Sequence, residues 1–123
     1  MSATRTTVVI EDDLDIRLLV STVLEGAGFV VHAAATGLDG IELVRRHDPS
    51  VVTLDVSMPG IDGFETARRI RAFSTTRILM VSARADDAEQ RAGREAGADD
   101  YLTKPFRPRE LRQRVESLLA ASA

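Results

Sequence analysis

The 123-residue sequence contains no cysteine and no long apolar run. Without cysteine, the chain can form neither a disulfide framework nor a thiolate metal site. Its apolar runs are only a few residues long, and the polar start, Met1 to Thr7, lacks an apolar core of signal-peptide length. We therefore expect a soluble, cytoplasmic protein that makes no contact with a membrane.

A strong net charge is also missing, because the formal charge is only −3 at pH 7 and the arginines are interleaved with Asp and Glu. This balance gives no general attraction to nucleic acid or to anionic lipid, so we expect no direct nucleic-acid binding by this chain. The hydrophobic share of 44% and the charged share of 28% are ordinary for a globular protein. The length suits one domain with a real core.

Short apolar runs alternate with amphipathic stretches about five times along the chain. The runs are β-branched and lack alternation, which is typical of strands buried on both faces of a parallel sheet. The predicted strands are 7–10, 29–32, 51–54, 78–81 and 100–102. A helical pattern follows each run, so the sequence predicts an α/β fold of (βα)₅ type with helices on both faces of an open sheet.

Apolar spacing and a cap signal support the helices of this pattern. Leu38, Ile41 and Val44 recur at helical spacing, and we expect all three to face the core. Asp86 or Asp87 is a suitable cap for the fourth helix.

Polar residues that can take part in catalysis or metal binding lie at the carboxyl ends of four predicted strands. In open parallel sheets, ligands bind beyond this edge. The residues are Glu11, Asp12, Asp13, Asp55, Ser82, Thr103 and Lys104. Each has an ordinary structural reading alone, as a turn, a helix cap or a surface charge, but together they place acids, a hydroxyl and a lysine on one edge.

This combination favours phosphoryl-transfer chemistry. Clustered carboxylates repel one another, and a hard divalent cation such as Mg²⁺, which prefers oxygen ligands, reduces this repulsion. An Asp carboxylate can act as a nucleophile and form an acyl phosphate. A lysine and a hydroxyl supply the neutralising charge and the hydrogen bond that phosphoryl transfer needs. His32 and His47 lie far from this edge, which disfavours a zinc site.

Four stretches resemble the receiver domain of response regulators in two-component signalling, most of all the receivers of winged-helix DNA-binding regulators. They are VVIEDD (8–13), VTLDVSMPGIDGFE (52–65), ILMVSAR (78–84) and GADDYLTKPF (97–106). The resemblance runs from about Thr6 to Leu119. It implies that residues 1–123 form one receiver domain with the flavodoxin-like strand order 2-1-3-4-5.

The resemblance also implies a role for each site residue. Asp55 matches the phosphoacceptor. The implied Mg²⁺ ligands are Glu11, Asp12, Asp55 and the backbone carbonyl of Ser57. Ser82 and Lys104 match the groups that contact the phosphoryl oxygens, with a cis bond before Pro105, and Tyr101 matches the aromatic residue that moves inward as Ser82 moves. The strand end before Glu11 favours Glu11-Asp12 as the acidic pair and leaves Asp13 to the helix start.

The resemblance implies that a sensor histidine kinase or a phosphotransfer protein phosphorylates Asp55. Phosphorylation then switches the conformation of the surface formed by the fourth helix, fifth strand and fifth helix. Regulators with similar sequences dimerise through this surface, so a phosphorylation-dependent homodimer is one expectation. Its charged candidates are Glu89, Arg91, Asp100, Glu110, Arg112 and Arg114. Beyond self-catalysed phosphotransfer and hydrolysis, we expect no enzymatic turnover.

Other interpretations are open at this stage. A pseudo-receiver would bind partners without phosphorylation. An aspartyl-phosphate phosphatase would carry a second Asp where Ser57 stands, and a flavodoxin would need a phosphate-binding loop where three carboxylates stand. Whether the domain acts alone or controls the DNA-binding part of a longer regulator is also open.

Overall fold

The computed structural model describes residues 5–84 and 86–121, in which five strands alternate with five helices. The strands are β1 (Arg5–Ile10), β2 (Phe29–Ala34), β3 (Val51–Asp55), β4 (Arg77–Ser82) and β5 (Asp100–Thr103). The helices are α1 (Leu14–Gly26), α2 (Gly37–His47), α3 (Gly63–Arg71), α4 (Asp87–Ala96) and α5 (Pro108–Ala120). The predicted (βα)₅ alternation is confirmed, with each strand one or two residues longer than expected.

All strands are parallel and form one sheet in the order β2-β1-β3-β4-β5, which confirms the expected order. β3 occupies the centre, and all five of its residues are buried. A parallel strand covered on both faces needs apolar side chains pointing in both directions. Val51 to Leu54 meet this need almost throughout, and the strand ends on Asp55.

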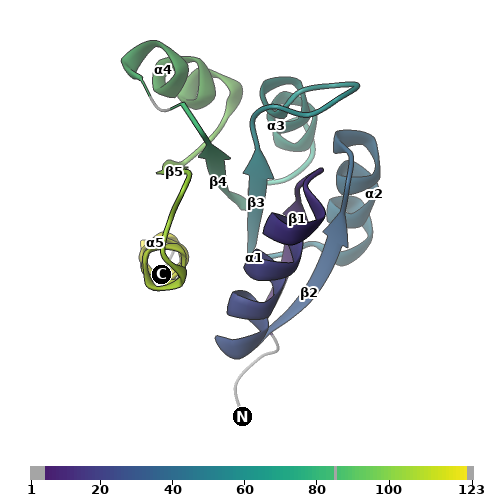
Figure 1. Cartoon of the computed structure of the whole chain (residues 1–123). Coiled ribbons are helices and arrows are strands. Elements are labelled where there is room, and N and C mark those ends of the chain that lie inside the picture. Colours follow the sequence, from purple (N-terminus) through teal and green to yellow (C-terminus); the bar gives the residue numbers. More distant parts are fainter. Residues whose placement is uncertain (1–4, 85, 122–123) are drawn as a thin grey trace.

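Helices cover both faces of the sheet (Figure 1). Val20 and Leu24 of α1 join Leu111 and Val115 of α5 in one apolar cluster. A second cluster on the opposite face collects side chains of α2, α3 and α4, including Ile70. The helix spacing predicted from the sequence therefore produces two cores separated by the sheet.

Local sequence signals explain where helices begin. The Asp13 carboxylate accepts a hydrogen bond from the Ile16 amide at 3.0 Å, and the Asp86 carboxylate accepts one from the Glu89 amide at 2.8 Å. Asp13 and Asp86 are thus the N-caps of α1 and α4. The prediction for Leu38 was wrong. Its side chain is 57% exposed, because it lies in the first turn of α2 while Ile41 and Val44 form the buried stripe.

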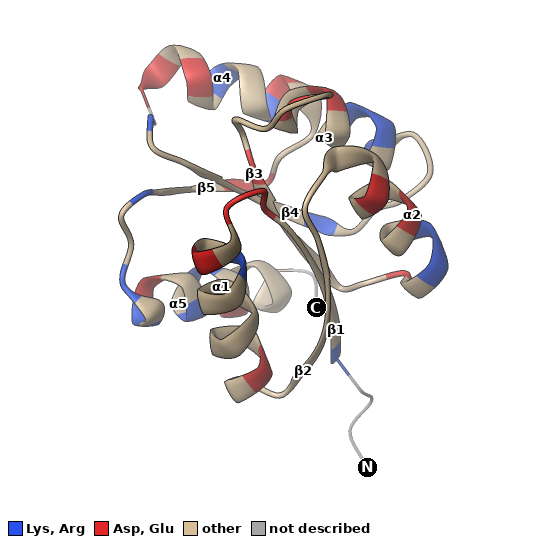
Figure 2. Cartoon of the chain, turned by 45° about the vertical axis from the view of Figure 1, so that its right-hand side comes forward, with Lys and Arg blue, Asp and Glu red and all other residues tan. Residues whose placement is uncertain are grey.

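Acidic and basic residues are interspersed over the helices, with acidic residues also gathered on the loop that follows β1 (Figure 2). This pattern matches the mixed surface expected from the sequence. None of the helices within the described residues combines the length and the apolar character that crossing a membrane requires.

Candidate functional site

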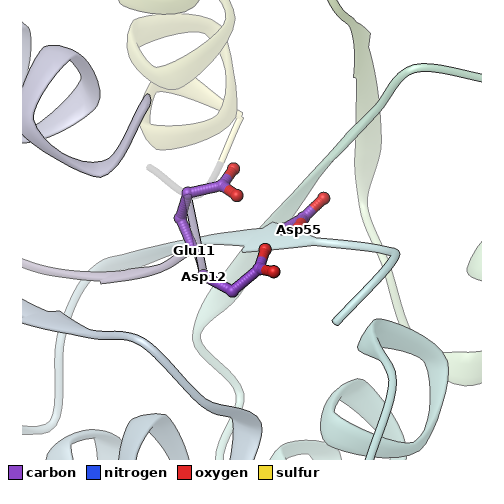
Figure 3. Close-up of side chains that lie close together, drawn as sticks. All are labelled: Glu11, Asp12 and Asp55. Atoms are coloured by element: carbon purple, nitrogen blue, oxygen red, sulfur yellow. The ribbon is translucent and has the colours of Figure 1, made fainter. Parts of the chain in front are cut away.

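Three carboxylates meet where β1 and β3 end (Figure 3). Asp55 is the last residue of β3 and is 4% exposed, and Glu11 directly follows β1 and is 3% exposed. Asp12 is exposed to solvent. One carboxylate oxygen from each residue lies within 4.8 Å of the others. The parallel pairing of β1 with β3 brings their carboxyl ends together, as predicted.

Lys104 reaches into the same cluster from the end of β5. Its Nζ lies 3.0 Å from Oε1 of Glu11 and 3.1 Å from Oδ1 of Asp55. The Lys104 amide also donates to the carbonyl oxygen of Ser82 at 2.7 Å. The bond from Lys104 to Pro105 is cis, as the resemblance implied. A cation from residue 104 thus sits between two buried acids from the first half of the chain.

The electrostatics of the cluster are those of crowded, buried acids. Burial, with further contributions from Asp12 and Glu11, raises the pKa of Asp55 to about 7, although Lys104 works in the opposite direction. For Lys104, burial alone would lower the pKa, but Glu11 and Asp55 outweigh it, and the pKa lies above its ordinary value. The folded protein therefore disfavours the ionised form of Asp55 unless additional positive charge is bound nearby.

The fit of this cluster to a metal ion follows from its donor set. Glu11, Asp12 and Asp55 offer only hard oxygen atoms, which suit Mg²⁺, and a divalent cation would relieve the repulsion that raises the pKa of Asp55. Asp12 is exposed, so water can complete the coordination shell, as Mg²⁺ requires. The cluster can hold a divalent metal ion.

Ser82 and Tyr101 are both buried, at 4% and 6% exposure. Ser82 ends β4, and its hydroxyl donates to the Glu89 carboxylate. The Tyr101 hydroxyl donates to the backbone carbonyl of Glu89 at 3.0 Å. The inward position expected for Tyr101 is therefore already taken in this structure, with Glu89 of α4 as its partner.

Two supporting contacts escaped the sequence analysis. The Arg17 guanidinium donates to the carbonyl oxygen of Glu11 at 3.0 Å. Gly63, the first residue of α3, lies so close to the end of β3 that an added Cβ would stand 2.4 Å from the carbonyl oxygen of Asp55. The Asp62-Gly63 pair is a turn signal in the sequence, but this contact depends on how α3 packs. Ser57 lies in the loop between β3 and α3 and is exposed.

Comparison with known proteins agrees with this geometry. Residues 7–116 match the family model described as the response regulator receiver domain, and the chain belongs to this family. It is a signalling receiver domain of the two-component type, as the sequence predicted. Nothing in the described residues favours the phosphorylation-independent alternative.

Similar proteins include several named transcriptional regulatory proteins. CseB of Streptomyces avermitilis is 46% identical over 110 residues, which cover 89% of this chain and 47% of CseB. AfsQ1 of Streptomyces coelicolor is 44% identical over 110 residues, covering 89% and 49%. The structure of chemotaxis protein CheY4 of Vibrio cholerae has a TM-score of 0.91 and 30% identity, covering 95% of this chain and 100% of CheY4. The chain spans about half the length of the curated relatives it matches.

Proposed function

We propose that Asp55 accepts a phosphoryl group in a Mg²⁺-dependent reaction and that this modification is the signal the domain transmits. The observation that carries the proposal is the position of the Asp55 carboxylate, buried beside Glu11 and Asp12 and 3.1 Å from Nζ of Lys104. A carboxylate in this setting is unfavourable without added positive charge.

The Mg²⁺ ligands in this proposal are Glu11, Asp12, Asp55 and the backbone carbonyl of Ser57. Bound Mg²⁺ would supply positive charge to the phosphoryl oxygens and hold them in place. In line with the resemblance, Asp12 and Asp55 would hold the ion directly and Glu11 would act through a water molecule. The Lys104 ammonium provides the second cation of the site.

The chemical step is a displacement at phosphorus. A carboxylate oxygen of Asp55 forms a bond to phosphorus, the bond between phosphorus and the donor breaks, and the donor leaves with that electron pair. Lys104 and the hydroxyl of Ser82 each donate a hydrogen bond to the phosphoryl oxygens of the product. Asp55 must be deprotonated to react, so the positive charge around it also prepares the nucleophile.

The donors we propose are a sensor histidine kinase or a phosphotransfer protein in the cytoplasm. The domain is then modified by its partner and hydrolyses its own acyl phosphate, without turnover of an outside substrate. Because the relatives are named transcriptional regulatory proteins, we also propose that phosphorylation controls a transcriptional output.

Phosphorylation is proposed to change the surface made by α4, β5 and α5 and to favour a homodimer there. Asp100 of β5 and Arg114 of α5 form an ion pair within this chain at 3.0 Å. Both side chains remain partly exposed, with Arg114 at 50%. They can therefore exchange their intramolecular contact for one with a second copy at modest cost.

The test is intact-protein mass spectrometry after incubation with acetyl phosphate, with and without Mg²⁺. We expect wild type to gain one phosphoryl group only when Mg²⁺ is present and Asp55→Asn to gain none. Asp39→Asn, which changes an exposed acid of α2, serves as the control and should behave like wild type. A folded wild-type protein that stays unmodified at saturating Mg²⁺ would refute the proposal.

A further inference from the structure

Glu89, in the first turn of α4, contacts both Ser82 of β4 and Tyr101 of β5. Its carboxylate accepts from the Ser82 hydroxyl, with Oε2 at 2.9 Å and Oε1 at 3.1 Å from Oγ. Its backbone carbonyl accepts from the Tyr101 hydroxyl at 3.0 Å. One residue of α4 is therefore bonded to the end of β4 and to β5.

The contact with Ser82 competes directly with phosphoryl binding. A serine hydroxyl carries a single proton and can donate it to one group at a time. In this structure the proton goes to Glu89, and the oxygen of Ser82 also accepts from the Arg84 amide at 3.1 Å. Ser82 is held on both its donor and its acceptor side, so it must break the bond to Glu89 before it can donate to a phosphoryl oxygen.

The Glu89 carboxylate competes strongly with a phosphoryl group for the hydrogen bond from the Ser82 hydroxyl. A hydrogen bond to a charged acceptor is roughly twice as strong as one between neutral groups, and Ser82 is almost fully buried. The helix-capping role falls to Asp86, whose carboxylate accepts from the Glu89 amide at 2.8 Å. The Glu89 side chain is thus left to face Ser82.

The sequence had suggested Glu89 as a candidate for pairs between two copies of the chain. Its side chain is instead engaged inside this one.

We propose that Glu89 is a positioning residue that restrains the phosphorylation of Asp55 by withholding the Ser82 hydroxyl. This inference rests on the proposed function. Phosphorylation draws Ser82 to the phosphoryl oxygens and releases the Glu89 carboxylate, which frees the first turn of α4. Because Tyr101 is bonded to the backbone of the same residue, β5 is affected together with α4. The release of Glu89 is then the step that passes the signal from the site to this surface.

The test compares initial rates of phosphorylation by acetyl phosphate at saturating Mg²⁺. Glu89→Ala should react about ten to one hundred times faster than wild type, the range expected for loss of one hydrogen bond to a charged acceptor. Glu89→Gln, which keeps the shape but not the charge, should fall between them. The matched control is Asp87→Ala, which removes another acid from the first turn of α4 and should stay within about twofold of wild type.

A double-mutant cycle with Ser82→Ala separates this role from a general charge effect. If Glu89 acts through the Ser82 hydroxyl, Glu89→Ala should produce no acceleration when Ser82 is already Ala. Carbon NMR gives a readout without phosphorylation, since the carboxyl resonance of Glu89 should move in Ser82→Ala while that of Asp87 stays in place.

The outcomes distinguish the two proposals. A wild type that gains no phosphoryl group would contradict the proposed function, and this inference with it. A normally phosphorylated wild type with unchanged Glu89 variants would contradict only the role of Glu89. So would an acceleration that persists in the Ser82→Ala background.

Discussion

Asp55 lies in a crowded and buried environment. Its carboxylate is buried among other acids and is compensated only in part by Lys104, which also contacts Glu11. The residue that the proposed chemistry needs as an anion is therefore the one on which the folded chain disfavours negative charge. Such a conflict is typical of functional sites, where reactivity is maintained at the expense of stability.

The first prediction concerns this conflict in the metal-free protein. Asp55 keeps its proton up to a pKa of about 7 when folded and loses it near 3.8 when unfolded. The folded state binds more protons between these values, so the free energy of unfolding falls as pH rises through this window. We expect Asp55→Asn to be more stable than wild type at pH 8, by about 1–3 kcal/mol, and to match it near pH 4.

Urea denaturation in EDTA at several pH values measures this difference. Asp39→Asn, on the surface of α2, should follow the wild-type pH profile. A wild type as stable as Asp55→Asn at pH 8 would show that the raised pKa of Asp55 does not hold in solution.

At the scale of elements, the site depends on how closely α3 approaches the end of β3. Gly63 begins α3, and Asp62 caps the helix by accepting from the Glu65 amide at 2.9 Å. An added Cβ at Gly63 would lie 2.4 Å from the carbonyl oxygen of Asp55 and 2.7 Å from Cα of Val56. Both neighbours are backbone atoms, so the contact can be relieved only by moving α3 or the strand end.

The second prediction follows from this contact. Gly63→Ala should destabilise the protein by about 1–3 kcal/mol, as overpacking does, and should slow phosphorylation because the end of β3 shifts. The matched control is Gly26→Ala at the end of α1, where an added Cβ meets nothing within 4 Å. That variant should be neutral or more stable by up to about 1 kcal/mol.

Denaturant unfolding and the acetyl phosphate assay measure the two effects. Equal behaviour of Gly63→Ala and Gly26→Ala in both would mean that the close approach of α3 to β3 has no consequence.

The sequence predicted some of these elements better than others. Helix caps depend on local signals, and the caps at Asp13 and Asp86 were predicted correctly. The strand order was implied by the family resemblance and is also confirmed. The prediction that Leu38 faces the core was wrong because three apolar residues at helical spacing do not reveal which of them lies at the edge of the buried stripe. The close approach at Gly63 depends on the packing distance between two elements, which no local pattern contains.

At the scale of the whole molecule, the third prediction concerns assembly. Acetyl phosphate with Mg²⁺ should convert the wild-type chain from monomer to dimer in sedimentation velocity experiments. Arg114→Ala should weaken this dimer several-fold, because it removes the partner of Asp100 on the α4-β5-α5 surface. Raising the salt concentration should weaken it as well, since these charges are exposed.

Arg46→Ala is the control, since Arg46 is an exposed residue of α2, which covers the opposite face of the sheet from α5. It should leave the dimer unchanged. A phosphorylated wild type that remains monomeric would contradict the predicted dimer without affecting the proposal that Asp55 is the phosphoacceptor.

The amino-acid sequence by itself determined the class of fold and the edge of the sheet where the candidate site lies. Buried β-branched runs alternating with amphipathic stretches specify a parallel sheet covered by helices, and such a sheet gathers its strand ends at one edge. The residue types at those ends, with the family resemblance, then indicated acids for a metal ion, a nucleophile in Asp55 and a cation in Lys104.

Only the tertiary structure decided which side chains are partners. Lys104 contacts both Glu11 and Asp55, and Glu89 contacts both Ser82 and Tyr101. These contacts depend on how separate helices and strands are placed relative to one another. Hydrogen bonds form or fail within a few tenths of an ångström, and this precision comes from packing rather than from local pattern. The pKa of Asp55 has the same origin, because burial and neighbouring charges exist only in the folded chain.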